Sequence, residues 1–149
     1  MSNFSDVTGK LSQAAQSSIQ AYDAYAHEDL FELFEEVVYK NNFEDFKALI
    51  EAGADLNLQN KYGWTLLHIS IRRDRHDMVN YLLDQGADIN KIDGVGWTPL
   101  MESIMDDMTE LCKLLVDRGA DITIANQRGA TAPMLVQKFG RQSMVSFFS

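Results

Sequence analysis

Few side chains in this sequence are equipped for catalysis. The single cysteine, Cys112, could act as a nucleophile with His68 as its base, and the other two histidines are His27 and His76. A lone cysteine forms neither an intramolecular disulfide nor a cysteine-rich zinc site, and three histidines leave little material for a metal cluster. Sparse cysteine also suits a reducing compartment, so the usage favours a cytoplasmic protein.

Carboxylates are plentiful, but their positions do not favour acid–base catalysis. Three recur in the tripeptide Gly-Ala-Asp, where a turn explains the aspartate. Two adjacent pairs would not converge on one point of a helix, and no GxxxxGK[ST] or GxGxxG loop is present. These carboxylates are Asp55, Asp88 and Asp121 in the tripeptides, and Glu35 with Glu36 and Asp106 with Asp107 in the pairs. The sequence therefore predicts no enzyme, no cofactor and no metal site.

An internal repeat of 33 residues organises the chain. The Gly-Ala-Asp string begins at Gly53, Gly86 and Gly119, and three further series share the same step. These series are Gly63, Gly96 and Gly129; Thr65, Thr98 and Thr131; and Trp64 and Trp97. Cys112 lies in the same repeat column as the apolar residues Phe46, Val79 and Val145. A buried structural thiol is therefore favoured over a nucleophile.

Each period predicts two short helices and a turn-rich connector. In residues 60–92, Gly63 sits in a polar turn and Thr65 can cap the amides of a first helix. This helix should end at Asp74, because aspartate tolerates the left-handed backbone that stops helices. A second helix then runs to Gly86. The equivalents of Asp74 are Asn41, Asp107 and Gly140, and the expected apolar faces are Leu67, Ser70 and Ile71, then Met78, Val79, Leu82 and Leu83.

The recurring residues resemble the ankyrin repeat. Asn60-Lys-Tyr-Gly-Trp-Thr-Leu-Leu-His and Leu82-Leu-Asp-Gln-Gly-Ala-Asp-Ile-Asn carry the likeness in one unit. Asp93-Gly-Val-Gly-Trp-Thr-Pro-Leu-Met and Leu114-Leu-Val-Asp-Arg-Gly-Ala-Asp-Ile carry it in the next. The resemblance covers roughly residues 27–149 and implies an all-α ankyrin-repeat solenoid with units 27–59, 60–92, 93–125 and 126–149. It also implies that His68 bonds backbone across repeats, which is a structural role.

The two ends depart from this pattern. The first unit has Leu30 and Glu32 in place of the glycine and threonine, and the fourth has Pro133 one position late. End repeats are stacked on one side only, so atypical ends are expected, and the fourth unit could be loosely ordered. Residues 1–26 show helical spacing of small and apolar residues and are predicted to cap the first unit. A partner-binding or disordered tail is the alternative.

The charge balance excludes several classes of partner. Thirteen basic and 22 acidic residues give a net charge of −9, the wrong sign for generic nucleic-acid binding. Residues 1–60 hold three bases and eleven acids, whereas residues 61–149 hold ten and eleven, so the acidity lies at the N-terminal end. No apolar run approaches the roughly 20 residues of a spanning helix, and residues 1–26 do not resemble a secretory signal. We expect a soluble protein without a nucleic-acid or membrane partner.

The resemblance implies that the turn tips and the first helices form a concave inner face that binds a protein. Tryptophan, tyrosine and arginine are enriched in binding hot spots, and exposed apolar patches mark interaction sites. The candidates are Tyr39, Lys40, Lys61, Tyr62, Trp64, Arg72, Arg73, Val95, Trp97, Met105, Asp106, Arg128, Lys138 and Phe139, with Gly94, Gln127 and Ala130 beside them.

The charges of this face are predicted to differ from those of the opposite side. Bases predominate on this face, with Asp106 as essentially the one acid if the frayed tip of the first unit is set aside. The second helices should face outward, and they carry the acids Glu44, Asp45, Glu51, Asp77, Asp84, Glu110 and Asp117. Trp64 and Trp97, on adjacent units, are expected to lie about 10 Å apart, so that one apolar patch of a partner could engage both. Neither ring should be needed to fill the core.

Two functions fit these features. The first is a non-catalytic protein–protein interaction module whose inner face grips one folded partner. The alternative is a bacterial immunity or inhibitor protein that neutralises a toxin or enzyme by direct binding. Small acidic inhibitors attract basic toxins electrostatically, and such a toxin would have to dock at the acidic N-terminal end.

Overall fold

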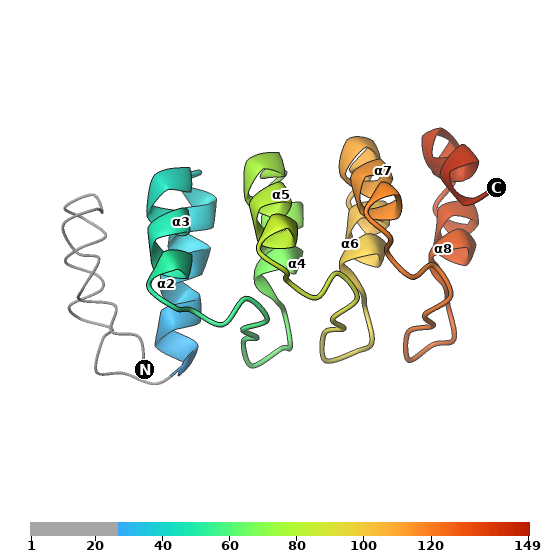
Figure 1. The fold of residues 1–149 in the computed structure, drawn as a ribbon. Coiled ribbons are helices and arrows are strands. Elements are labelled where there is room, and N and C mark those ends of the chain that lie inside the picture. Colours follow the sequence, from blue (N-terminus) through green and yellow to red (C-terminus); the bar gives the residue numbers. More distant parts are fainter. Residues whose placement is uncertain (1–26) are drawn as a thin grey trace.

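A computed structural model describes residues 27–149 of the protein. Over this range four helix pairs stand side by side, and long loops that project away from the helices join them (Figure 1). The pairs are α2 (His27–Tyr39) with α3 (Phe43–Glu51), α4 (Leu66–Arg72) with α5 (His76–Asp84), α6 (Pro99–Met105) with α7 (Thr109–Asp117), and α8 (Ala132–Lys138) with the 3₁₀ helix η2 (Gln142–Phe148). The regular elements in the described range are all helical, so the predicted all-α repeat architecture is confirmed. The cap predicted for residues 1–26 lies outside the described residues.

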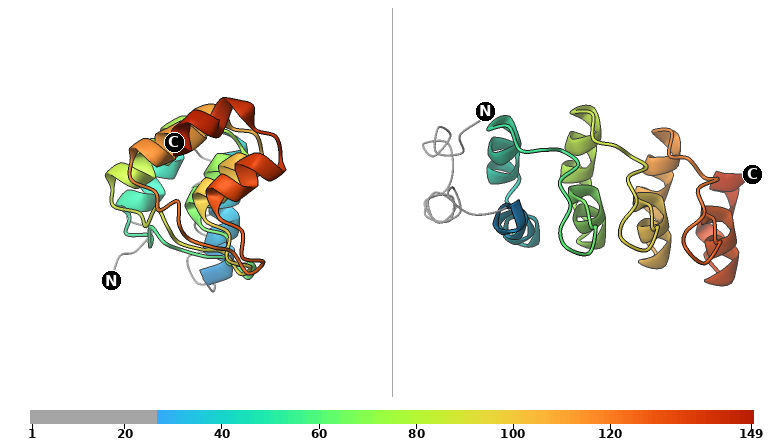
Figure 2. Two further views of the ribbon diagram at one scale, coloured as in Figure 1. Left: turned by 90° about the vertical axis from the view of Figure 1, so that its right-hand side faces the viewer. Right: turned by 90° about the horizontal axis from the view of Figure 1, so that it is seen from below.

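The helix pairs stack as two rows. Viewed along the stack, the first helices of the pairs fall over one another, and so do the second helices (Figure 2). Packing along the first row is continuous, because α4 contacts α2 and α6, and α6 also contacts α8. In the second row α3 packs on α5, and α7 packs on η2. Each unit therefore buries its apolar surface against its neighbours, as a solenoid requires.

Threonine side chains begin two of the first helices. Thr65 Oγ1 accepts a hydrogen bond from the backbone N–H of residue 68 at 3.2 Å, and Thr98 Oγ1 accepts one from residue 101 at 3.1 Å. Thr131 precedes α8 in the same way but makes no side-chain capping bond. Pro133, the second residue of α8, has no N–H, which removes one of the two donors that a capping side chain can satisfy.

The predicted stops of the first helices are confirmed. Asn41, Asp74 and Asp107 have positive φ angles of 55°, 59° and 56°, and Gly140 has 65°. Asparagine and aspartate tolerate this left-handed conformation because their short polar side chains bond locally. The chain can therefore reverse within a few residues and lay the second helix against the first.

The predicted apolar columns form the core of the stack. Phe46, Val79 and Cys112 share one repeat column and are all fully buried. Val145, in the same column of the last unit, is 46% exposed. Within the described residues no helix pair follows η2, so nothing stacks over this side chain. Burial is also complete or nearly so for Leu67, Ser70, Ile71, Met78 and Leu82, whereas Leu83 is half-buried.

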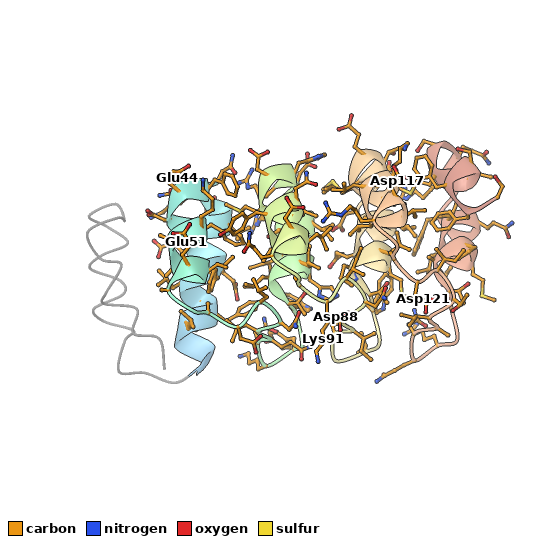
Figure 3. All side chains as sticks on the ribbon, in the orientation of Figure 1. Glu44, Glu51, Asp88, Lys91, Asp117 and Asp121 are labelled. Carbon is orange, nitrogen blue, oxygen red and sulfur yellow. The ribbon has the colours of Figure 1, made fainter. Side chains whose placement is uncertain are left out.

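One acid predicted to lie on the outer side is buried. Asp45 is only 3% exposed, and its Oδ2 accepts a bond from Asn42 Nδ2 at 2.8 Å while its N–H donates to Asn42 Oδ1 at 3.2 Å. This exchange caps the start of α3. The other acids predicted for the second helices are exposed, and Figure 3 labels three of them, Glu44 and Glu51 on α3 and Asp117 on α7.

Asparagine and aspartate side chains fold the connecting loops. Oδ1 of Asn60 accepts the backbone N–H groups of Tyr62 and Trp64, at 3.0 and 2.9 Å. Asp93 and Asn126 form the same pair of bonds in the next two loops. Such side-chain bonds hold a loop in one conformation. They therefore fix the backbone from which both tryptophans project.

Two arginines tie neighbouring helix pairs together. Arg75 Nε and Nη2 donate to the carbonyls of Val38 and Tyr39 at the C-terminal end of α2, at 2.9 and 2.7 Å. Arg141 binds the last two carbonyls of α6 in the same way, at 2.9 and 2.8 Å. The last carbonyls of a helix lack intrahelical donors, and a cation there also interacts favourably with the helix dipole. Each arginine therefore holds one unit to the preceding one.

Candidate functional site

The first helices and the loop tips form one side of the molecule, which we term the inner face. Three hollows lie on it: the N-terminal hollow between the first two helix pairs, the tip hollow beside the loop at residues 60–62, and the C-terminal hollow between the last two pairs. Most of the predicted site residues line one of them. Trp64, Arg72 and Arg73 line the N-terminal hollow, Lys61 and Tyr62 the tip hollow, and Val95, Trp97, Met105, Arg128, Lys138 and Phe139 the C-terminal hollow.

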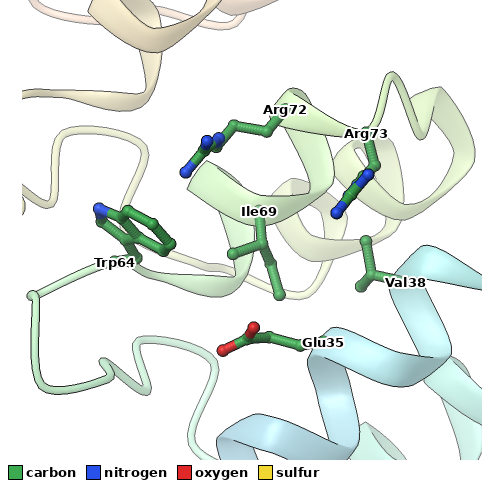
Figure 4. Close-up of a pocket in the computed structure, with 6 residues that line it drawn as sticks. All are labelled: Glu35, Val38, Trp64, Ile69, Arg72 and Arg73. Carbon is green, nitrogen blue, oxygen red and sulfur yellow. The ribbon is translucent and has the colours of Figure 1, made fainter.

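Arginine side chains stack on aromatic rings around the N-terminal hollow. The guanidinium carbon of Arg72 lies 4.6 Å from the centroid of the Trp64 ring, and that of Arg73 lies 4.8 Å from the centroid of the Tyr39 ring. Figure 4 shows both arginines at the C-terminal end of α4 and Trp64 on the loop before this helix. Each contact is favourable by about 0.5–1 kcal/mol at an exposed site. The cations are therefore held in place by the protein itself.

Carboxylates also reach this hollow. Glu35 of α2 lines it and lies on the far side of it from Arg72 (Figure 4). Glu102 of α6 approaches from the next unit, with its Oε1 3.9 Å from Arg72 Nε. The prediction of essentially one acid on the inner face, Asp106, is therefore wrong. Around the N-terminal hollow the arginines therefore lie beside carboxyl groups of two other helices.

Glu102 and Asp106 form a close carboxyl pair beside Arg72. Burial and the neighbouring Asp106 carboxyl group together raise the pKa of Glu102 to about 8, although Arg72 opposes the shift. Asp106 is half-buried, and its Oδ2 is enclosed without a hydrogen-bond donor among the described residues. A protonated Glu102 can donate to this oxygen, which accounts for both observations. Asp106, a predicted partner-binding residue, lies against Glu102 and lines none of these three hollows.

The C-terminal hollow is mainly apolar. Val95 and Met105 are 51% and 43% exposed on it, and Trp97 and Phe139 are half-buried against the core. Lys138 Nζ lies 5.9 Å from the centroid of the Phe139 ring at the edge of the hollow. This surface combines exposed apolar area with cations around it, and its composition is typical of a binding site.

The two tryptophans lie in different hollows. Trp64 lines the N-terminal hollow, whereas Trp97 lines the C-terminal one. Both rings are half-buried and packed against the core. The two rings therefore line separate hollows, and both pack against the core without belonging to its fully buried set. Repeat spacing places equivalent backbone positions on neighbouring units but does not show which side chains surround each ring.

Lys40 is the predicted basic residue that lines none of the hollows. It is exposed at the end of α2, where its Nζ lies 2.8 Å from Glu36 Oε1. An exposed pair of this kind, four residues apart on a helix, contributes about 0.3–0.5 kcal/mol. Its role in the structure is local.

His68 has the structural role that was predicted for it. The side chain is fully buried, its Nδ1 accepts the backbone N–H of Thr65 at 3.1 Å, and its Nε2 lies 3.0 Å from the carbonyl of Trp97 in the next unit. Burial lowers the pKa of the imidazole. The neutral form with hydrogen on Nε2 satisfies both partners, so His68 joins two repeats and is not placed as a catalytic base.

Cys112 is fully buried, as predicted. Burial raises the pKa of its thiol to about 11, so almost none of it is thiolate at neutral pH. A nucleophile must be ionised and accessible, and this sulfur is neither. Residues 27–149 also hold no group of three or more histidine, cysteine, aspartate or glutamate side chains placed to bind a metal ion.

Sequence reasoning missed several residues that shape the inner face. The loop-folding column Asn60, Asp93 and Asn126 has the 33-residue period and could have been found with the glycine and threonine series. Arg75 and Arg141 are 66 residues apart, or two periods, and a column comparison would have revealed them too. Nothing in the spacing signals that Glu102 turns toward Arg72, because that contact depends on how two units pack.

The comparison with known families agrees with the repeat geometry. The chain matches ankyrin repeats in three copies over residues 34–126, and it belongs to the ankyrin repeat family. Ankyrin repeats are generally protein–protein interaction modules and are typically non-catalytic. No curated protein matches the chain as a close relative. Within residues 27–149 the structure contains no helix with the length and apolar character needed to cross a bilayer.

Proposed function

We propose that the protein is a non-catalytic, cytoplasmic binding protein whose inner face grips one folded protein partner. The observation that carries this proposal is the set of three hollows along one face, lined by exposed aromatic, apolar and arginine side chains. Tyr39 and Tyr62 are 61% and 56% exposed. Large apolar groups that remain in solvent on one side of a protein are the area that a partner can cover.

The arrangement of these groups also supports binding of a folded partner. Trp64, Trp97 and Phe139 pack partly against the core, so less conformational entropy is lost when a partner covers them than for fully exposed side chains. The family match over residues 34–126 points the same way. Catalysis is not proposed, because the buried thiol and histidine are both used in the core.

Site-specific photo-crosslinking tests this proposal. A photoreactive amino acid is placed at position 62 on the inner face or, as the matched control, at position 44 on α3; both native side chains, Tyr62 and Glu44, are exposed. We expect one protein adduct from position 62 in living cells and none from position 44. The purified partner should then bind Tyr62→Ala with roughly tenfold lower affinity, at an unchanged melting temperature. Equal adducts from both positions would contradict binding through the inner face.

The inhibitor or immunity function remains a second proposal because of the acidic outer helices. Exposed acids line the second helices, among them Glu44, Glu51 and Asp117 (Figure 3), and an acidic surface attracts a basic toxin or enzyme. Crosslinking would distinguish the two functions. An adduct from position 44 alone, to a basic protein whose activity falls on binding, would favour inhibition through the acidic end.

A further inference from the structure

We propose that the C-terminal hollow receives a large apolar side chain from an acidic segment of the partner. This inference rests on the proposed function and adds to it the chemistry of the segment that binds. It concerns the surface between α6 and α8, where Val95, Trp97, Met105 and Phe139 meet Arg128 and Lys138.

The apolar side chains of this hollow are poorly covered. About half of Val95 and of Met105 is exposed, at 51% and 43%, and both flank the half-buried rings of Trp97 and Phe139. An apolar partner group placed here would remove several such surfaces from water at once, which is favourable in proportion to the area buried. The hollow is therefore suited to an aliphatic or aromatic anchor.

The charges around the hollow select an acidic segment. Arg128 and Lys138 line it, and neither has an ion-pair partner among residues 27–149. Residues 126–149 contain three bases and no acid, whereas residues 1–125 contain ten bases and 22 acids. The third base, Arg141, is already held by two carbonyls of α6. Two cations are thus left for carboxylates that flank the anchor, and like charge disfavours a basic segment.

The N-terminal hollow lacks this combination. Its Arg72 stacks on Trp64 and approaches Glu102, and Glu35 also lines it. Because Arg72 already has an aromatic ring and carboxyl groups beside it, it offers less to a charged partner. Trp97 is therefore a better candidate anchor contact than Trp64, although the two occupy the same repeat column.

Two single-tryptophan variants report on the hollows separately. The sequence has two tryptophans, so Trp64→Phe leaves only Trp97, and Trp97→Phe leaves only Trp64. Short random peptides displayed on phage are selected on the full chain, and the enriched peptides are synthesised for fluorescence titration. We expect enriched peptides with aspartate or glutamate on both sides of a leucine, isoleucine, phenylalanine or tryptophan. They should change the emission of Trp97 in Trp64→Phe but not that of Trp64 in Trp97→Phe.

A charge-reversal pair provides the matched control. Arg128→Glu with Lys138→Glu should weaken peptide binding by roughly tenfold or more. Lys113→Glu with Arg118→Glu changes the net charge equally on exposed positions of the outer side and should leave affinity within about twofold. Replacing the apolar anchor of the peptide by alanine should abolish saturable binding. Thermal melts of each variant check that it is folded.

The outcomes separate this inference from the proposed function. Peptides that are basic or uncharged, or that alter only the Trp64 emission, would overturn the inference and leave binding by the inner face intact. The inference would also be overturned if the chain self-associates and the double variant Arg128→Glu with Lys138→Glu abolishes this association. The C-terminal hollow would then be occupied by a second copy of the chain. Absence of any peptide that alters either reporter, together with no adduct from position 62, would contradict both.

Discussion

Glu102 is protonated more readily than an ordinary glutamate because it is buried beside another carboxylate. Its pKa rises from 4.5 to about 8. Between these values the folded state binds more protons than the unfolded state, so the free energy of unfolding falls as the pH rises. The stabilising effect is complete below about pH 4.5 and is lost by the time the pH has passed through about 8. His68 acts in the opposite sense, because its pKa is lowered and its contribution is lost as the solution becomes acidic.

Glu102→Gln should remove this pH dependence. The amide is neutral at every pH and can donate to Asp106 Oδ2, the enclosed oxygen. We expect the variant to be more stable than the wild type by about 1–3 kcal/mol at about pH 9 and nearly equal to it at about pH 5. Urea unfolding at both pH values measures the difference, in which the contribution of His68 cancels. Glu110→Gln, at an exposed position of α7, is the control, and the idea fails if the two variants respond alike.

At the scale of the element, stacked loops leave no room beside certain glycines. Gly63 has a φ of +82°, and a Cβ atom on it would lie 2.4 Å from the backbone nitrogen of Gly94 in the next loop. That nitrogen donates a hydrogen bond to the carbonyl of Tyr62 at 2.9 Å. Gly129 has a similar φ of +78° in the last loop, but a Cβ there would meet nothing within 4 Å. Glycine therefore suits the backbone conformation at both positions. At Gly63 it is also required because the next loop approaches closely.

Alanine at these two glycines should separate the two effects. Gly129→Ala places an alanine in the left-handed conformation without creating a close contact, and this should cost about 1–2 kcal/mol of stability. Gly63→Ala also forces two loops apart and should cost about 3 kcal/mol or more. Denaturant unfolding of both variants gives the comparison. Equal losses would show that the loops separate without cost and that stacking does not contribute to cohesion.

At the scale of the whole molecule, the chain is a row of units whose stability depends on the interfaces between neighbours. The arginine of one unit holds the first helix of the preceding unit at two of these interfaces, through Arg75 and Arg141. Between the second and third units the equivalent residue is Met108. There the units are joined instead by the bond of His68 to the Trp97 carbonyl and by the contact of Arg72 with Glu102.

Arg141→Met copies the residue found at position 108 and should loosen the last unit alone. Two hydrogen bonds from a charged group are lost, and we expect a cost of about 2–3 kcal/mol. Hydrogen exchange read by mass spectrometry should show faster exchange in α8 and η2, with α4 and α5 unchanged, because local opening follows local contacts. Uniformly faster exchange along the chain would show instead that the array unfolds as one cooperative body.

Much of this organisation could be predicted from particular residues. Asn41, Asp74, Asp107 and Gly140 mark the ends of the first helices because left-handed backbone restricts the residue type. The 33-residue columns likewise predict the burial of Cys112, and the resemblance to the ankyrin repeat implies the cross-repeat role of His68. Val145 and Asp45 could not be placed in this way. The first depends on whether another unit covers it, and the second on a side-chain exchange with Asn42.

The sequence by itself determined the repeat and the two helices per unit. These follow from local rules, since periodicity, capping and turn chemistry act over a few residues. The face on which aromatic and basic residues gather was implied by the resemblance to the ankyrin repeat. Only the tertiary structure decided that Trp64 and Trp97 lie in separate hollows and that Glu35 and Glu102 surround Arg72. It also decided that Arg128 and Lys138 stay without ion-pair partners among the described residues. Which charges meet depends on the rotation and distance between packed units, and no pattern within one unit encodes that geometry.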